Sequence, residues 1–266
     1  MSDAIGRRVP KFRDLRALEQ KKYRDESGQF LIEGVKLVAS ALSAGFPVKS
    51  LIATAKMSEN IPPEIAMFLK KNTVPIAIVS AKDMERISAM KSPEGILAVG
   101  LIPDNRLEKT AVAPVPAIYL WEVNDPGNLG TIFRTALWFG VRNILLSPGS
   151  VDPYNPKAVR GSMGALFGLN IFTEVDLPAL SEIVEKTGAR LLAADMSGAP
   201  PQGKTIGENW LMAFGSESHG LPDKILQKAD SVFAIRKRGD GESLNLAISV
   251  GIMLNEILQE QELNIL

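Results

Sequence analysis

Short apolar runs alternate with segments of helical periodicity, and the alternation falls into two blocks. In the first block, one helix is expected over residues 30–45, with apolar residues at Val35, Val38, Ala39 and Leu42. Strands are expected at 48–54, 75–80 and 95–100, with helices at 62–72 and 81–89. This pattern predicts a small α/β unit in the first part of the chain.

The second block contains five apolar runs of the kind found in buried parallel strands. These strands are expected at 117–123, 143–148, 190–196, 211–216 and 232–237. Helices are expected between them, near 129–139, 156–166, 178–187 and 221–229, and at the end of the chain over 243–260. Strands alternating with helices predict an α/β fold with an open parallel sheet covered on both faces.

The boundary between the blocks is expected in a stretch of irregular sequence. Residues 103–116 contain three prolines and show no periodicity. The predicted organisation is a first domain at 1–106, a linker at 107–114 and a second domain at 115–266.

Composition narrows the chemistry that the chain can perform. Of its 266 residues none is cysteine, which excludes a disulfide scaffold, thiolate-held metal clusters and a cysteine nucleophile. His219 is the single histidine, so a site with several histidine ligands is impossible and no metal is expected. The chain shows no secretory signal and no apolar stretch of membrane-spanning length, which gives a cytoplasmic expectation.

The formal net charge of zero conceals a basic N-terminal arm. Residues 1–24 hold eight basic and three acidic residues, and 8 − 3 gives a net charge of +5. Such an arm could follow an RNA backbone, because neutralised phosphates release their counterions; the alternative is a solvated chain terminus. The candidate RNA-binding residues of the arm are Arg7, Arg8, Lys11, Arg13, Lys21, Lys22 and Arg24.

Three polar loops at predicted strand ends carry the candidate chemistry. They are 124–134, 215–221 and 238–245, each leading from a strand to a helix. Ligands of open α/β sheets bind at the carboxyl ends of strands, which favours a shared site. The alternative is ordinary turn chemistry, with Asn128 and Ser243 as helix N-caps.

Two further signals are weak. Residues 198–205 match the Walker A pattern formally, but Pro200 and Pro201 lack the N–H groups that cradle phosphate. A strand is expected soon after this string, where a phosphate-binding loop requires a helix. His219 lies in a polar loop and could be a general acid or base, although a surface or capping role is the more common one.

The three loops resemble, in order and spacing, motifs 1, 2 and 3 of the SpoU/TrmH-like family. The stretches are NDPGNLGTIFRTALWFG (124–140), FGSESHGL (214–221) and IRKRGDGESLNLAISVGIMLNE (235–256). The family comprises S-adenosylmethionine-dependent RNA ribose 2′-O-methyltransferases of the SPOUT superfamily. The first block resembles the L30e-like substrate-binding domain attached to many members that act on ribosomal RNA. KYRDESGQFLIEGVKLVASAL and KSPEGILAV carry this weaker match.

The resemblance implies a parallel sheet with a deep trefoil knot, a homodimer and bound S-adenosylmethionine. Position by position, it implies catalytic roles for Asn128, Arg134, Glu217, Ser243 and Asn245. It implies cofactor binding by Gly215, Ser216, Gly220, Ile235, Leu244 and Asn245. Arg134, whose planar guanidinium suits phosphate, joins the candidate RNA-binding residues.

The expected function is 2′-O-methylation of ribosomal RNA of the 23S type. The alternatives are a transfer RNA methyltransferase and a non-catalytic RNA-binding or ribosome-assembly protein of the same fold. Arg134 could be the general base, as proposed for the family, or an electrostatic clamp on phosphate, because a guanidinium resists deprotonation. One departure stands out: Arg236 and Lys237 replace the usual Pro-Met after Ile235, and these side chains either touch RNA or are solvated.

Overall fold

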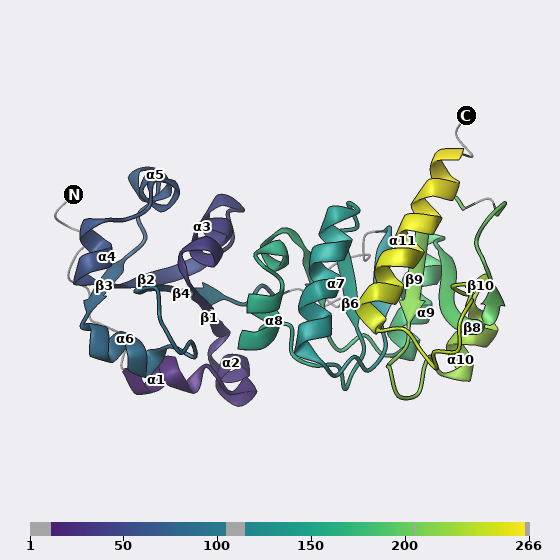
Figure 1. Cartoon of the computed structure of the whole chain (residues 1–266), viewed down its shortest axis with the longest axis horizontal. Coiled ribbons are helices and arrows are strands. Elements are labelled where there is room, and N and C mark those ends of the chain that lie inside the picture. The colour runs from purple at the N-terminus through teal and green to yellow at the C-terminus, as the bar shows by residue number, and fades with distance from the viewer. Residues whose placement is uncertain (1–11, 105–114, 205, 264–266) are drawn as a thin grey trace. The chain divides into compact units, whose positions relative to one another are not determined.

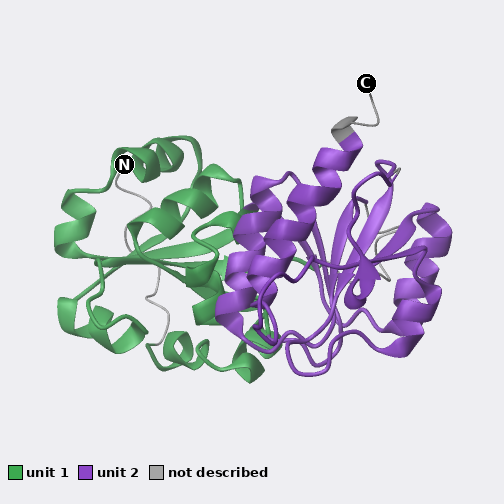
Figure 2. Cartoon of the chain, turned by 45° about the vertical axis from the view of Figure 1, so that its right-hand side comes forward, with its two compact units in different colours: residues 1–104, 152–167 green, residues 105–151, 168–266 purple. Residues whose placement is uncertain are grey.

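The computed structural model describes residues 12–104, 115–204 and 206–263, except for the side chains of Glu262 and Leu263. The described chain forms two compact units, shown in separate colours in Figure 2. Unit 1 comprises residues 1–104 and 152–167, and unit 2 comprises 105–151 and 168–266. The units therefore differ from the predicted domain ranges, because residues 152–167 pack with the N-terminal part of the chain.

Unit 1 is built on a four-stranded mixed sheet with the order β1-β4-β2-β3. Its strands are β1 (Gln29–Glu33), β2 (Val48–Thr54), β3 (Ile76–Val79) and β4 (Ile96–Leu101). β4 pairs antiparallel with β1 and β2, whereas β2 and β3 are parallel. Its N-terminal helices are α1 (Phe12–Ala17), α2 (Lys21–Ser27), α3 (Val35–Ser43), α4 (Ala55–Glu59), α5 (Pro63–Lys71) and α6 (Ala81–Ile87).

The single helix expected over 30–45 is wrong: the segment forms β1 followed by α3. Gly34 separates the two elements with a φ of 95°, a conformation that favours glycine. The backbone N–H of Val35 donates to a Glu94 carboxylate oxygen at 2.6 Å, so an anion satisfies the beginning of α3. The apolar residues before Gly34 are buried in the sheet instead of lying on a helix face.

Residues 152–167 complete the core of unit 1. This segment contains α8 (Pro156–Gly161) and leads into the 3₁₀ helix η2 (Ala165–Gly168), where one helix over 156–166 is expected from sequence. The ring of Tyr154 lies 4.8 Å from that of Phe30, and the ring of Phe167 lies 5.1 Å from that of Phe46. Both rings fill spaces that the N-terminal residues alone leave open.

A buried ion pair fastens the same segment. Arg24 is 1% exposed, and its guanidinium binds Asp152 through Nε at 2.7 Å and Nη2 at 2.5 Å. Its Nη1 donates to the carbonyls of Leu18 and Glu19 at 2.7 and 2.8 Å. The prediction that Arg24 binds RNA is therefore corrected, because every nitrogen of its guanidinium is used inside unit 1.

Unit 2 is built on a six-stranded parallel sheet with the order β10-β8-β9-β5-β6-β7, of which Figure 1 labels β6, β8, β9 and β10. Its strands are β5 (Ala117–Leu120), β6 (Asn143–Leu146), β7 (Asn170–Phe172), β8 (Arg190–Ala199), β9 (Trp210–Phe214) and β10 (Ser231–Phe233). The expected α/β class and parallel sheet are confirmed. The strand missing from the prediction, β7, has three residues, too few to show a pattern.

Helices cover both faces of this sheet. α7 (Pro126–Trp138) and α11 (Leu246–Leu263) pack against each other on one face, and α9 (Leu177–Thr187) and α10 (Asp223–Lys228) lie on the other (Figure 1). Side chains from β5, β6, β8 and β9 form one buried cluster with α9 and α10. Within the described residues, no helix combines the length and apolarity needed to cross a membrane.

Candidate active site

The strand order of unit 2 places two of the polar loops next to each other. From β5 the chain proceeds to β6 and β7 on one side of the sheet, and it then crosses to β8, β9 and β10 on the other. β5 and β9 are therefore neighbours at the point where the order reverses. In parallel sheets the crevice at such a point is the usual ligand site. Asn128 follows β5 and Glu217 follows β9, so both lie at the edge of the sheet where such a crevice is expected.

A chain of hydrogen bonds joins three of the predicted site residues. The amide Nδ2 of Asn245 donates to Oδ1 of Asn128 at 2.9 Å. The amide Nδ2 of Asn128 donates in turn to Oε1 of Glu217. These residues belong to motifs 3, 1 and 2, respectively, and lie up to 117 positions apart in the sequence. The structure therefore brings the three motifs together within one unit.

The beginning of α11 fixes the direction of this chain. Oδ1 of Asn245 accepts the backbone N–H groups of Ala247 and Ile248 at 3.0 and 3.3 Å. Because that oxygen is taken, the NH₂ group of Asn245 must face Asn128. The same constraint orients Asn128, whose oxygen faces Asn245 and whose NH₂ faces the Glu217 carboxylate. One N–H of Asn128 and one oxygen of Glu217 remain available to a ligand.

Neither of the N-caps expected from ordinary turn chemistry is present. α7 is capped by Asp125, whose carboxylate accepts the backbone N–H of Asn128 at 2.8 Å. α11 is preceded by Asn245, which accepts the first free N–H groups, rather than by Ser243. Since Asp125 does the capping, the side chain of Asn128 is free for the bonds to Asn245 and Glu217.

The loop after β9 folds back on itself and leaves no space for a side chain at Gly215. Ser216 and Gly220 pair in a short antiparallel bridge, and the Gly220 N–H donates to the Ser216 carbonyl at 2.9 Å. A Cβ added at Gly215 would lie 2.0 Å from the carbonyl carbon of Gly220, which no side chain tolerates. Gly220 has a φ of 68°. Both glycines are required to bring backbone groups to the loop surface.

A bulge in β8 places a further acidic residue, Asp195, near the loop after β9, outside the three sequence motifs. β10 pairs with Ala193 and then with Ala199 of β8, so residues 194–198 bulge out of the ladder. In this bulge Asp195 accepts the N–H and the hydroxyl of Ser197 at 2.9 and 2.7 Å. The other carboxylate oxygen of Asp195 lies 3.9 Å from the position that a Cβ would take if one were added at Gly220. An acidic residue at a strand end, followed by Ser-Gly, is the signal that could have indicated it.

The remaining predicted cofactor residues border the same loops. Ser216 is buried, Ile235 is partly buried, and Leu244 is 50% exposed just before Asn245. Ser243 is exposed in the loop between β10 and α11. Ser216 belongs to the loop after β9, and the other three belong to the segment between β10 and α11.

Arg134 does not join the cluster in this chain. It lies six positions after Asn128 on α7, which separates the two by about 9 Å along the helix and about 120° around it. Its side chain is exposed on the stripe that also carries Thr131 and Trp138. The single chain therefore leaves the predicted arginine away from the other site residues.

Other candidates have ordinary roles. His219 is exposed, and its backbone N–H donates to the Ser216 hydroxyl at 3.3 Å. In the Walker-like string, the N–H of Gly203 donates to the Glu260 carboxylate at 3.0 Å, a partner that would repel phosphate. Across the described part of the chain, no three His, Asp or Glu side chains gather as metal ligands do.

The described residues of the basic arm are helical. Arg13 is exposed on α1, while Lys21 and Lys22 on α2 pair with Asp25 and Glu26 at 3.0 and 3.9 Å. Exposed pairs of this kind contribute little and can open to a stronger anion. The other predicted residues of the arm, Arg7, Arg8 and Lys11, lie outside the described residues.

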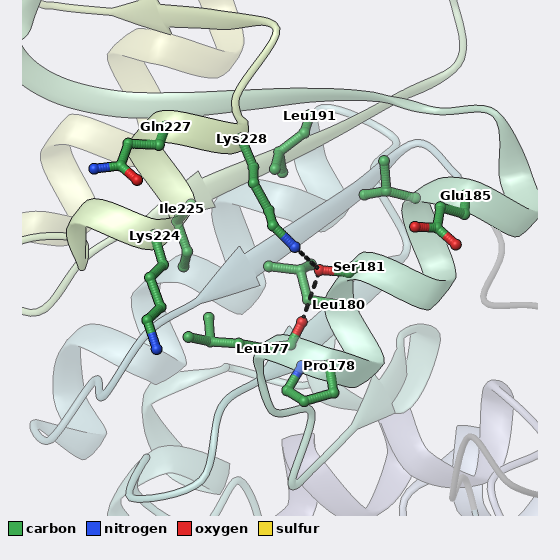
Figure 3. A pocket seen from close by; sticks show the side chains of 11 residues that line it. Leu177, Pro178, Leu180, Ser181, Glu185, Leu191, Lys224, Ile225, Gln227 and Lys228 are labelled. Atoms are coloured by element: carbon green, nitrogen blue, oxygen red, sulfur yellow. Dashed lines mark hydrogen bonds between the residues drawn. The ribbon is translucent and has the colours of Figure 1, made fainter.

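A pocket of about 640 Å³ lies between α9 and α10 (Figure 3). Leu177, Leu180 and Ile225 contribute to its apolar lining, and Lys228 Nζ donates to the Ser181 hydroxyl at 2.9 Å. None of its lining residues belongs to the three motif loops. This pocket is therefore separate from the Asn128 crevice.

The fold is an α/β fold with a parallel sheet, and three predicted site residues meet where the strand order of that sheet reverses. The sequence model of the SpoU rRNA Methylase family matches residues 116–255, more than half of the chain. The chain belongs to the SpoU rRNA methylase family. Residues 10–98 match the MRM3-like substrate binding domain, in agreement with the expectation for the first block.

Several relatives are similar over nearly their whole length. A Synechocystis protein named as an uncharacterized tRNA/rRNA methyltransferase is 34% identical, covering 95% of this chain and 92% of that protein. The Bacillus subtilis 23S rRNA (guanosine(2553)-2′-O)-methyltransferase RlmP is 29% identical, covering 92% of this chain and 94% of that protein. The AdoMet-bound rRNA methyltransferase of Sinorhizobium meliloti has a TM-score of 0.83 at 28% identity, covering 96% of this chain and 98% of that one.

Proposed function

We propose that this protein is an S-adenosylmethionine-dependent rRNA methyltransferase that methylates a ribose 2′-hydroxyl, with 23S-type rRNA as substrate. The observation that carries the proposal is the directed hydrogen-bond chain from Asn245 through Asn128 to Glu217 at the crevice. The 23S rRNA 2′-O-methyltransferase among the relatives, which is similar over both units, supports the substrate.

The crevice fits the cofactor in its backbone chemistry. The bridge between Ser216 and Gly220 closes a tight turn, and Gly215 could not carry a side chain beside it. An adenosine and an amino-acid end can be held there by backbone donors and acceptors of 215–221 and by Ile235 and Leu244. The sulfonium supplies the methyl group, so the chain itself needs no covalent nucleophile.

The side chains of the cluster hold the ribose in line for attack. Asn128 presents its remaining N–H, and Glu217 its remaining oxygen, to the RNA backbone and ribose hydroxyls. The Asn128 amide cannot rotate freely, because its oxygen accepts from Asn245 and its NH₂ donates to Glu217. The Glu217 carboxylate is held in turn by that NH₂ group. Good alignment of two reacting groups is worth about 7–11 kcal/mol of the barrier. Arg134 is exposed, and its planar guanidinium suits a phosphate, so its role in this proposal is that of a clamp on phosphate.

The active form is a homodimer in which α7 and α11 meet their counterparts. Three exposed apolar side chains lie on or beside these helices: Trp138 (86% exposed), Ile248 (54%) and Leu244 (50%). Arg134 lies on the same stripe of α7 as Trp138, so association through this face would carry Arg134 to the partner's cluster. A trefoil knot, formed as the 234–245 loop passes toward α11, is part of this proposal. The match of residues 116–255 to the SpoU rRNA Methylase family supports it.

Light scattering tests the dimer. We expect twice the chain mass of 28.8 kDa at micromolar concentration. Replacement of the exposed indole in Trp138→Glu should shift the protein toward monomer and lower methyl transfer together. The matched control is Met67→Glu, a 62% exposed apolar residue on α5 in unit 1. A monomeric wild-type protein with full activity would contradict the shared site.

Transfer of labelled methyl groups tests the activity. We expect purified protein to methylate unmodified 23S rRNA at one ribose, with no incorporation into 16S rRNA or bulk transfer RNA. Resistance of the modified phosphodiester to alkali locates the 2′-O-methyl group. Incorporation into transfer RNA alone would overturn the substrate, and binding of rRNA without incorporation would overturn the activity.

A further inference from the structure

Three consecutive cations follow β10 and begin the loop that leads to Asn245. Arg236, Lys237 and Arg238 are all exposed. None of the three forms an ion pair among the residues that the structure describes, although Asp240 and Glu242 lie a few positions further along. Lys21, Lys22 and Lys186, by contrast, each pair with a carboxylate four positions away.

The loop that carries these cations is lightly packed. A Cβ added at Gly239 or Gly241 would meet no atom within 4 Å, so both glycines are surrounded by open space. The loop ends at Asn245, which is tied to Asn128 and to the beginning of α11. The loop is thus fixed at its Asn245 end, at the candidate active site. Around the two glycines no packed neighbour prevents its backbone from changing conformation.

The spacing along the chain keeps the basic stretch close to the reacting ribose. Arg238 and Asn245 are seven positions apart, and a fully extended chain of that length spans at most about 25 Å. The cations therefore remain within a few nucleotides of any ribose held by Asn128 and Glu217. Three adjacent like charges repel one another until a polyanion neutralises them, and the phosphodiester backbone is such a polyanion.

We propose that Arg236, Lys237 and Arg238 form an RNA-backbone clamp on the cofactor-side loop, binding phosphates that flank the methylated nucleotide. The inference rests on the proposed function, and it assigns to these residues a role distinct from holding the methyl donor. A single carboxylate, such as that of the cofactor's amino-acid end, neutralises one charge and leaves two exposed. Phosphates spaced along a strand can engage all three.

Salt-dependent RNA binding tests the clamp. The triple variant Arg236→Gln, Lys237→Gln, Arg238→Gln is compared with wild type for binding to unmodified 23S rRNA between 50 and 300 mM KCl. Each lost phosphate contact reduces the slope of log K against log salt by about 0.7–1, so a total reduction of about 2–3 is expected. Affinity near 0.15 M salt should fall at least tenfold, with calorimetric affinity for S-adenosylmethionine unchanged.

A matched variant controls for net charge. Lys186→Gln, Lys224→Gln, Lys228→Gln removes three exposed lysines of α9 and α10, two of which line the pocket in Figure 3. This control should keep the wild-type salt slope. An equal loss in both triples would overturn the clamp in favour of a diffuse charge effect.

Two other outcomes would overturn it as well. Loss of cofactor affinity with unchanged RNA binding would assign the cations to the methyl donor. A wild-type salt slope in the 236–238 variant, combined with normal methylation by the wild-type protein, would overturn the clamp and leave the proposed function intact. Absence of rRNA binding by the wild-type protein would overturn both, so the two failures are distinguishable.

Discussion

Asn128→Ala should reduce methyl transfer by about 100- to 1,000-fold without changing the fold. The magnitude is that of removing one preorganised donor from the site of a reaction. Asn128 is the central member of the chain, so its loss frees Glu217 and leaves the Asn245 amide without an acceptor. Single-turnover methylation of 23S rRNA at saturating cofactor measures the effect, and far-UV circular dichroism monitors the fold.

Further variants distinguish the orientation of the Asn128 side chain by Asn245 from the contact that Asn128 itself makes with the RNA. Asn245→Ala removes the group that orients Asn128 but leaves the Asn128 side chain in place, so it should lower the rate by a smaller factor. Because both residues act in one chain, the double variant should be scarcely slower than Asn128→Ala. Asn128→Asp keeps the size but places an anion against the Glu217 carboxylate, and it should be as slow as the alanine variant.

Two results would contradict this reading of the site. Wild-type single-turnover rates in Asn128→Ala would remove Asn128 from the chemistry. If the rate reduction of the double variant equalled the product of the two single reductions, Asn128 and Asn245 would act independently. That result would contradict a functional role for the 2.9 Å hydrogen bond between them. Gln227→Ala, an exposed change on α10 at the opposite face of the sheet, is the control that should leave the rate unchanged.

Sequence patterns predicted most elements because strong periodicity left few alternatives. The strand expected at 48–54 coincides with β2, and the helix expected near 178–187 is α9 with one more residue at its beginning. The error at 30–45 arose where a buried strand meets a helix across Gly34. The apolar residues on either side fit helical spacing, and the partner of the turn, Glu94, is 59 positions away from Val35.

Of the predicted site residues, Asn128, Glu217 and Asn245 lie together in the structure, whereas Arg134 does not, and the direction of their hydrogen bonds was not predictable. Loops at strand ends meet wherever strands are adjacent, so Asn128 and Glu217 could be expected together. The direction of each hydrogen bond could not, because it depends on the N–H groups of Ala247 and Ile248 that occupy the Asn245 oxygen. The Asp195 bulge was missed because the register shift in β8 has no counterpart in the sequence pattern.

Arg24→Ala should destabilise unit 1 by about 3–5 kcal/mol, the usual cost of removing one partner of a buried ion pair. The loss leaves Asp152, whose side chain is 9% exposed, as a buried anion. It also leaves the carbonyls of Leu18 and Glu19 without their donor. Charge pattern alone assigned Arg24 to the basic arm, because its partner lies 128 positions away in the sequence.

The two units can be monitored separately in urea. All three tryptophans, Trp121, Trp138 and Trp210, belong to unit 2, so indole fluorescence reports on that unit alone. Circular dichroism reports on both units. In Arg24→Ala we expect a transition at lower urea concentration by circular dichroism, from the unfolding of unit 1. The urea midpoint of the fluorescence transition should fall by less. Coincident and unshifted transitions would show that the ion pair contributes nothing to unit 1.

Two controls distinguish this structural role from RNA binding. Arg13→Gln removes an exposed charge of α1 and should change the free energy of unfolding by less than about 0.5 kcal/mol. The double variant Arg24→Met, Asp152→Leu removes both buried charges and should recover much of the loss, because apolar side chains can replace a buried pair. A contact made only to RNA would give the opposite pattern, with lower RNA affinity in Arg24→Ala, an unchanged urea midpoint and no rescue by the change at Asp152.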